Sequence, residues 1–588
     1  MLDLLLCIAA IQSAAPQEPA NPQEPIAPHL QAVPEQLTAL VTVNDMPGLL
    51  LQGRENSWYR YFLDPELAQL RSWFDPHQAA EGEWQHGHER QSLHSLADSL
   101  EALTVFFAPT SESPVGALGV VLHAHEAHQP LSDQVQRFHA RLAHQEEPAL
   151  ETWHDTTLRI YNATDSADGE DVPATVVCAE FGELFLFVMA EVANADRDFV
   201  IQLAKESIDR SMDLESASIL TNERFLEARS SSPAPLPTGR GHHIEGFVDV
   251  SSLARLIPKD RKAEPIIAAV VRSLSSIPWV YASTTLGKGE EMDSQFGFRC
   301  DRSTLLGRLL GLAEPAPEDM LALLPPDSAT ISMGAFDMNG LVDMLLEGVD
   351  KYAPAGSAQK LRATLTFVQA QFGLDPVDDL LRSFTGRFAV FQRYDPDRPI
   401  ADSSDPLTFS MIETLVLDLN DGEEFAEYLL EVLSIVGVEA NLEIDEYEDV
   451  DIYSLPDGPP ISWTITDEFI AVSGRRDDLE HLIRASRSKQ PSVQDGERMA
   501  LALEQTHGTT LFSVSDTAAV LKAMGEAFDM VSTVSSATPR LMEMSETFGA
   551  FGSAGILAPD LVDKYVSGLM YSSWSVEDSR VWLRSWGR

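Results

Sequence analysis

The feature that most constrains the fold is an ordered set of elements that occurs twice, about 290 residues apart. Residues 31–52 contain a proline-containing loop, a strand pattern and a candidate helix cap at Asn44 or Asp45. Residues 323–345, LLPPDSATISMGAFDMNGLVDML, repeat this order with Asp337 as the candidate cap, and Pro325 follows Pro34 by 291 residues. A steady offset along an ordered list of elements indicates an internal repeat. The sequence therefore predicts that one folded module occurs twice.

Elements further along each copy keep the same order. The strand pattern of residues 117–127 corresponds to that of residues 412–422, and each is followed by a helical pattern. In the second copy this helix begins with acids and ends before Gly437, as helix dipole and C-cap preferences favour. Each copy then adds a shorter segment that finishes in a long alternating hairpin. The two hairpins fall at residues 279–300 and 569–586.

These patterns predict an α+β fold. Strands in antiparallel pairs alternate with helices, so we expect duplicated modules of mixed, mostly antiparallel sheet with helices packed on one face, in two large and two small units. Stretches rich in proline, serine and glycine mark the joints. The expected boundaries are a signal peptide at 1–15, a proline-rich tether at 16–28, a large α+β unit (copy 1) at 29–229, a linker at 230–243, a small α+β unit (copy 1) at 244–312, a large α+β unit (copy 2) at 313–508 and a small α+β unit (copy 2) at 509–588.

Three segments carry a resemblance to a known family: LLPPDSATISMGAFDMNGLVDM, GLDPVDDLLRSFTGRFAVF and DEFIAVSGRRDDLEHLI. With them the sequence resembles an uncharacterised family of exported bacterial tandem-repeat α+β proteins, over most of residues 29–510. The motifs are structural, so the resemblance implies export and a repeated α+β fold, and it carries over no catalytic residue. The first copy departs from the family pattern by a histidine-rich insertion at residues 77–94.

The N-terminus predicts export. The apolar run from Leu4 to Ile11 has the length of a signal-peptide core and is too short to span a bilayer. We expect cleavage near Ala15 and a periplasmic or extracellular location. Asp3 stands where a signal peptide usually carries a basic residue, so a start upstream of Met1 stays open, and Cys7 raises a lipoprotein alternative. No later apolar run is long enough to predict an integral membrane segment in the mature chain.

The charge balance restricts the partners. Asp and Glu number 91 against 41 Lys and Arg, for a net charge of −50. Such a surface repels phosphate backbones and anionic lipid, so we expect no nucleic-acid partner. The expected partner is an unknown protein or a cell-envelope component. Cleavage leaves two cysteines, Cys178 and Cys300, which is no disulfide framework, and the sequence leaves open whether they are bridged.

Histidines give the one hypothesis for a site. Ten of the 15 lie between His77 and His154. Residues two apart in a strand share a face, so His86, His88, His123 and His125 are the candidate metal ligands, with spacing that suits zinc or copper. The sequence fixes no cysteine or acidic residue as a third ligand, and the second copy places Asp418 and Asn420 near the positions of His123 and His125. A solvent-facing strand end and a pH-sensing face are the competing interpretations.

Two glycine-containing stretches resemble motifs of hydrolases and nucleotide-binding proteins, but their residues do not have the spacing that these motifs require. The glycines of GAFGSAG do not form a nucleophile elbow, and LGKGEE is a hairpin turn rather than a phosphate loop. We therefore predict an exported, non-enzymatic scaffold or binding protein of unknown ligand, built from a tandem duplication and without a cofactor. The alternatives are a secreted hydrolase or metal-dependent enzyme that uses the histidine-rich first half, and a carrier of a small apolar ligand. An enzyme should show a pocket with convergent polar groups, and a scaffold an exposed apolar surface.

Overall fold

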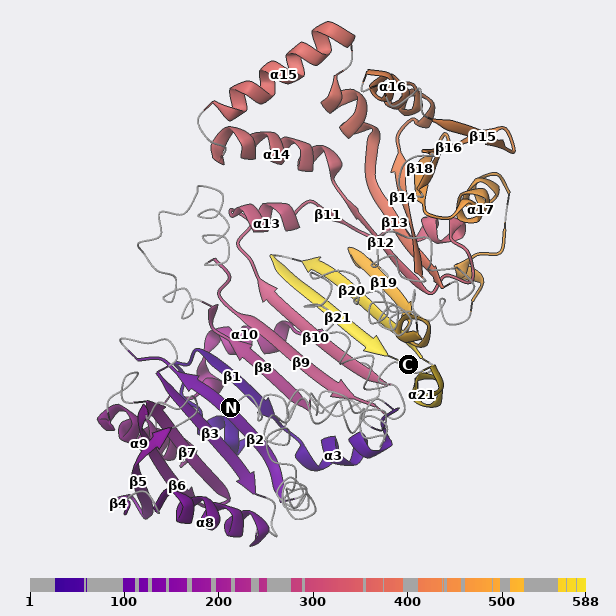
Figure 1. Ribbon diagram of the computed structural model, residues 1–588. Helices are drawn as coiled ribbons and strands as arrows, with labels where there is room; N and C mark the ends of the chain where they lie inside the picture. Colours follow the sequence, from indigo (N-terminus) through magenta and orange to yellow (C-terminus); the bar gives the residue numbers. More distant parts are fainter. Residues whose placement is uncertain are drawn as a thin grey trace, which may run out of the picture. The chain divides into compact units, whose positions relative to one another are not determined.

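The computed structural model describes residues 27–57, 60, 99–110, 116–124, 129–143, 147–165, 172–191, 197–212, 217–233, 243–250, 276–287, 291–352, 356–373, 375–394, 411–435, 437, 442–455, 461–488, 490–496, 508–522, 559–566, 568–577 and 579–587. The predicted signal peptide, most of the predicted tether and linker, and His86, His88 and His125 lie outside this part. The described chain divides into two compact units, residues 27–301 (unit 1) and 302–587 (unit 2) (Figure 1).

Unit 1 contains ten described strands. They are β1 Ala39–Val43, β2 Leu100–Ala108, β3 Ala117–Ala124, β4 Ala149–Trp153, β5 Thr156–Asp165, β6 Val172–Phe181, β7 Leu184–Glu191, β8 Ile244–Val248, β9 Val280–Leu286 and β10 Met292–Arg299. All the register-defined pairs among them are antiparallel, in the order β4-β5-β6-β7-β3-β2-β1-β8-β9-β10. Strands β8 to β10, expected in a separate small unit, therefore continue the sheet of the first large unit.

Short helices connect and cover these strands. They are α2 Pro28–Gln31, α3 Met46–Glu55, α8 Gln129–Ala143, α9 Arg197–Ser211, the 3-10 turn η2 Ile219–Thr221 and α10 Glu223–Ser231. Helix α3 begins where the Asp45 carboxylate accepts the Gly48 amide, which identifies Asp45 as the cap. Its Met46 and Leu49 join Leu100, Phe185 and Leu286 in one apolar cluster. Helix α9 packs against β6 and β7.

Unit 2 contains a second set of ten strands and one two-residue strand. They are β11 Ala313–Glu314, β12 Thr330–Phe336, β13 Phe384–Tyr394, β14 Met411–Leu419, β15 Glu443–Tyr447, β16 Val450–Ser454, β17 Ser462–Ile465, β18 Phe469–Ser473, β19 Leu511–Asp516, β20 Leu569–Glu577 and β21 Arg580–Gly587. The antiparallel order is β15-β16-β17-β18-β14-β13-β12-β19-β20-β21, and β11 pairs with the end of β12. Counted from β1 and from β12, both units follow the order 4-5-6-7-3-2-1-8-9-10.

The helical elements of unit 2 are α13 Leu305–Leu310, η4 Glu318–Leu323, α14 Met338–Tyr352, α15 Ser357–Phe372, η5 Pro376–Leu380, η6 Leu381–Ser383, α16 Gly422–Ile435, α17 Arg476–Arg487, η9 Val493–Asp495 and α21 Pro559–Tyr565. The predicted cap Asp337 accepts the Gly340 amide. Gly437 follows α16 with φ of 75°, a left-handed conformation that glycine adopts without strain. Helix α17 packs on β17 and β18.

The fold class is α+β with antiparallel sheet, as expected from the alternation of strand and helix patterns. None of the described helices is both long and apolar enough to cross a membrane. Both cysteines are buried free thiols, which answers the question the sequence left open. Burial raises the pKa of Cys178 to about 12, so this thiol is held in its unreactive form.

Candidate functional site

His123 is the one member of the predicted metal set that lies in the described residues. It is on β3, is buried, and its Nε2 atom is 3.6 Å from a carboxylate oxygen of Glu183. Its ring lies 6.0 Å from that of His29, with 26° between the ring planes. Among the described residues no group of three or more His, Cys, Asp or Glu side chains is arranged to hold a metal ion. The proposed four-histidine site stays a prediction.

His29 is the partner that the sequence did not suggest. It lies on α2, which packs against β2, β3, α9 and η2, and its side chain is 3% exposed. Its Nε2 atom is 3.2 Å from Oδ1 of Asn44, whereas its Nδ1 atom has no hydrogen-bond partner among the residues that the structure describes. Burial is the main cause that lowers the pKa of His29 to about 4, and the hydrogen bond to Asn44 opposes this effect only in part.

A fully buried carboxylate, Glu245 on β8, continues this cluster. It accepts hydrogen bonds from Asn44 Nδ2 at 2.6 Å, from Arg229 Nε at 2.9 Å and from the Tyr281 hydroxyl. Burial, followed by the negative charge of Glu245, raises the pKa of Tyr281 well above its ordinary value, so Tyr281 remains a donor. The charge of Glu245 is thus matched by one cation and two neutral donors from three other parts of unit 1.

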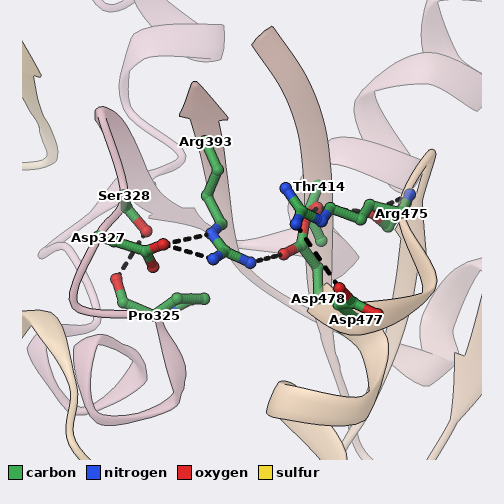
Figure 2. Close-up of polar contacts among 9 residues, drawn as sticks. Pro325, Asp327, Ser328, Arg393, Thr414, Arg475, Asp477 and Asp478 are labelled. Atoms are coloured by element: carbon green, nitrogen blue, oxygen red, sulfur yellow. Dashed lines mark hydrogen bonds and ion pairs between the residues drawn. The ribbon is translucent and has the colours of Figure 1, made fainter. Parts of the chain in front are cut away.

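Unit 2 buries a different carboxylate, Asp478, at the start of α17 (Figure 2). Arg393 on β13 donates to Asp478 at 2.7 Å and to Asp327 at 3.0 Å, so its guanidinium joins a buried acid to an exposed one. Thr414 on β14 donates to the second oxygen of Asp478 at 3.1 Å. Burial alone would lower the pKa of Arg393, but its hydrogen bonds to the two carboxylates raise it above the ordinary value.

Both clusters bind together segments that are far apart in the sequence. In unit 1, Asn44, Arg229 and Glu245 join the end of β1 to α10 and β8. In unit 2, Asp327, Arg393 and Asp478 join the loop before β12 to β13 and α17 (Figure 2). Beside the unit 1 cluster, the Nδ1 atom of His29 keeps a lone pair that no described residue uses in a hydrogen bond.

No protein-family model, curated protein or solved structure matches this sequence.

Proposed function

We propose that the chain is a tandem duplication of one α+β unit. The shared ten-strand order supports this, and so do matched backbone hydrogen bonds at corresponding places. Thr38 donates to Phe107 and accepts from Asp249, and Ala329 likewise donates to Gln392 and accepts from Asp516.

A second match lies just before the first strand of each set. The Val33 carbonyl accepts from the amide of Ile219 at 3.0 Å, and the Leu324 carbonyl accepts from that of Val493 at 3.2 Å. Val33 and Leu324 are 291 residues apart, the same offset that separates the two prolines that follow them. Repetition of such long-range contacts is the signature expected of a duplicated unit.

We propose further that the protein is an exported, non-enzymatic scaffold that binds an extended polypeptide segment at the outer edges of its sheets. One observation carries this proposal. Among the described strands, β4 pairs only with β5 and β15 only with β16, and the second residue of each is an exposed apolar side chain. Leu150 on β4 is 68% exposed and Ile444 on β15 is 57% exposed. An open strand edge offers backbone donors and acceptors to an added strand.

Each of these edge strands is held against a helix by the same kind of contact. In unit 1, Lys205 of α9 is 2.5 Å from a Glu151 oxygen and 4.9 Å from the centre of the Trp153 ring. In unit 2, Arg484 of α17 lies 5.7 Å from the centre of the Tyr447 ring and donates to its hydroxyl at 2.9 Å. An edge strand that is fixed before binding loses less conformational entropy on binding.

The charge of unit 2 selects the kind of segment. Strand β15 has the sequence EIDEY, with Glu443, Asp445 and Glu446 exposed. Glu446 lies directly opposite Asp451 of β16, and like charges in this position repel each other. A basic extended segment with an apolar residue beside Ile444 would relieve this repulsion and cover the side chain. The expected export and the resemblance to a family of exported proteins support a partner in the envelope or outside the cell.

The test is capture from the envelope fraction of the source cells with the full chain as bait. The variants are Leu150→Lys, Ile444→Lys and the two together, and the control is Phe367→Lys, whose side chain is 62% exposed and belongs to helix α15 rather than to an edge strand. We expect the double edge variant to lose at least ~90% of the captured partner, because Lys on an edge opposes strand addition, and the control to lose none.

Hydrogen exchange of the complex provides the direct readout. The amides of β4 and β15 should become protected when the captured partner is added. Equal loss of capture in the Phe367 control, or unchanged exchange in both edge strands, would contradict the proposal.

The metal-dependent alternative makes the opposite prediction for the same preparation. Chain purified without chelator would contain zinc or copper at about one ion per molecule, and His123→Ala would remove it. Our proposal expects no such metal in elemental analysis of the purified chain.

A further inference from the structure

The turn of each edge hairpin determines which backbone groups face the open edge of the sheet. Strand β15 joins β16 through a two-residue turn, residues 448–449, in which both φ angles are positive, and Tyr447 pairs with Val450 across it. A turn of two residues closes on a hydrogen-bonded pair, and such pairs alternate with non-hydrogen-bonded pairs along an antiparallel ladder. The pairs that Ile444 and Glu446 make with β16 are therefore of the non-hydrogen-bonded kind, so the amides and carbonyls of these two residues point away from β16.

Strand β4 has the same geometry. Its turn to β5 also has two residues, and the two strands pair directly across it. By the same alternation, Leu150 and Thr152 present their amides and carbonyls to the open edge. Each edge strand therefore offers two residues to an added strand, and the first of the two carries the exposed apolar side chain, Leu150 or Ile444. The second residue differs, because it is Thr152 on β4 and Glu446 on β15.

Ile444 is the outer end of an apolar row that crosses four strands of unit 2. It pairs with Tyr453 of β16, Tyr453 pairs with Trp463 of β17, and Trp463 pairs with Val472 of β18. The Tyr453 and Trp463 rings are stacked, with their centroids 5.6 Å apart. Side chains directly opposite each other on one face of a sheet contact each other. An apolar residue of an added strand opposite Ile444 would extend this row and cover its exposed end.

Glu446 places negative charge on the same face, one position along the open edge. It pairs with Asp451 of β16, and in a non-hydrogen-bonded pair the Cα atoms are only about 4.5 Å apart, so the two side chains are close. Both side chains are exposed. Among the described residues Asp445 is bound to Arg476, whereas neither Glu446 nor Asp451 has a cation as its partner. A basic residue of an added strand opposite Glu446 would therefore meet two carboxylates that no described cation neutralises.

We propose that Glu446 is a specificity-determining residue, through which β15 selects a segment with a basic residue two positions before an apolar one. The order follows from antiparallel addition, because the residue opposite Glu446 then precedes the residue opposite Ile444. All the register-defined pairs of unit 2 are antiparallel, and this pairing is slightly the more stable one. On β4 the corresponding pair is Thr152 and Thr157, so this strand accepts the apolar residue without a preference for the basic one. The specificity rests on the proposed edge-strand function.

The probes are synthetic peptides that differ at one position, Thr-Lys-Thr-Ile-Thr, Thr-Gln-Thr-Ile-Thr and Thr-Glu-Thr-Ile-Thr, together with the reversed peptide Thr-Ile-Thr-Lys-Thr. Dissociation constants are measured on the full chain carrying Leu150→Lys, in which only β15 is left open. The Lys peptide should bind about threefold to fivefold more tightly than the Gln peptide, because opposite charges directly across a strand pair attract each other modestly. The Glu peptide should bind more weakly than the Gln peptide, and the reversed peptide at least about threefold more weakly than the Lys peptide.

Unit 1 supplies the matched substitution. Glu446→Thr installs on β15 the residue that β4 carries, and should reduce the preference for the Lys over the Gln peptide to less than about twofold while the Gln peptide binds as before. Glu431→Gln removes one negative charge from an exposed position of α16, and should keep the full preference. The full chain carrying Ile444→Lys, in which only β4 is open, should distinguish the two peptides by less than about twofold.

Hydrogen exchange read residue by residue tests the register independently of affinity. In the free chain the amides of Ile444 and Glu446 should exchange faster than those of Asp445 and Tyr447, and the Lys peptide should protect the first two. Protection of these two amides together with equal binding of the Lys and Gln peptides would overturn the specificity and leave the edge-strand function standing. If no peptide protects β15, both proposals fail. A reversed peptide that binds more tightly than the Lys peptide, or an undiminished preference in Glu446→Thr, would also overturn the specificity.

Discussion

Unit 1 and unit 2 share a strand order but bury different charges. The register of the first strand of each set makes the difference visible. In unit 1, Thr42 of β1 pairs with Glu245 of β8, and both side chains are buried. In unit 2, the corresponding pair is Met333 of β12 and Phe512 of β19, which are buried and apolar. The position of a polar network in unit 1 is therefore occupied by two apolar side chains in unit 2.

The reverse exchange occurs where unit 2 buries Asp478. Thr414 of β14, which binds Asp478, pairs with Phe391 of β13. In unit 1 the corresponding pair is Gly119 and Phe106, and the Phe106 ring lies over the glycine, where an added Cβ would come within 2.1 Å of it. Gly119 is required by this close approach.

Both units keep the same antiparallel strand pairing, whereas the buried polar side chains on these strands differ between the units. Replacing a whole buried ion pair by apolar side chains of similar volume changes the free energy of unfolding little, because the cost of desolvating the two charges offsets their attraction. Removing one partner destabilises the fold strongly, because the other charge stays buried without its partner. The two units are consistent with this rule, because a buried apolar pair, Met333 and Phe512, stands in unit 2 where unit 1 has Thr42 and Glu245.

The largest expected effect comes from breaking the unit 2 network. Asp478→Ala removes the buried partner of Arg393 and of Thr414, and should destabilise unit 2 by about 3–5 kcal/mol while leaving unit 1 unchanged. Urea unfolding followed by pulsed hydrogen exchange reads the two units separately. The double variant Arg393→Ala/Asp478→Ala should cost less than the sum of the single variants.

A matched surface change gives the scale for this measurement. Asp445→Ala removes an exposed partner of Arg476 and should cost less than about 1 kcal/mol. If Asp478→Ala lowers the free energy of unfolding of unit 2 by no more than Asp445→Ala does, the buried network does not stabilise unit 2. The different buried charges of the two units would then not affect their stability.

A smaller effect is expected in unit 1. Glu245→Gln keeps the shape of the side chain, but one of its atoms becomes a donor, so one of the three donors around it loses its acceptor. We expect about 2 kcal/mol of destabilisation confined to unit 1. The cost is lower than for Asp478 because the Arg229 side chain is 36% exposed and can turn to water.

The control for this variant is Glu151→Gln, which alters the half-exposed partner of Lys205 and should cost less than about 1 kcal/mol. An equal cost for the two substitutions, measured by the same unit-resolved unfolding, would mean that burial of Glu245 contributes nothing.

Local features of the fold were predictable from the sequence, and long-range contacts were not. Asp45, Asp337 and Gly437 mark helix ends through rules that act within four residues, and all three have the expected geometry. The contact between His29 and His123 joins residues 94 positions apart, and no spacing rule relates them. A histidine after Pro28 in a helix of four residues has no periodicity to show that it is buried.

The burial of Glu245 was easier to predict from the sequence than the burial of Asp478. Glu245 lies two residues from Phe247, so strand alternation already places it on the face of a buried aromatic side chain. Asp478 follows Asp477 in the first turn of α17, where acids are favoured by the helix dipole and are usually solvated. Only the tertiary position of Arg393 distinguishes the buried aspartate from its exposed neighbour.

The smallest expected effect concerns the charge of the two edges. Strand β15 exposes Glu443, Asp445 and Glu446, of which Asp445 is bound to Arg476, whereas β4 carries one acid, Glu151, which is bound to Lys205. A basic segment on β15 should therefore bind more weakly at high salt, by about threefold to tenfold between 0.15 and 0.5 M NaCl, because screening shortens the range of its attraction. The dissociation constant of a segment on β4 should change by less than about twofold.

The two edges can be measured separately. Leu150→Lys leaves only the β15 edge able to bind, and Ile444→Lys leaves only the β4 edge, so the dissociation constant of the captured partner for each variant gives the two salt dependences. If both edges respond equally to salt, the acids of β15 do not select the partner and the units bind through what they share, the open strand edge and its apolar residue.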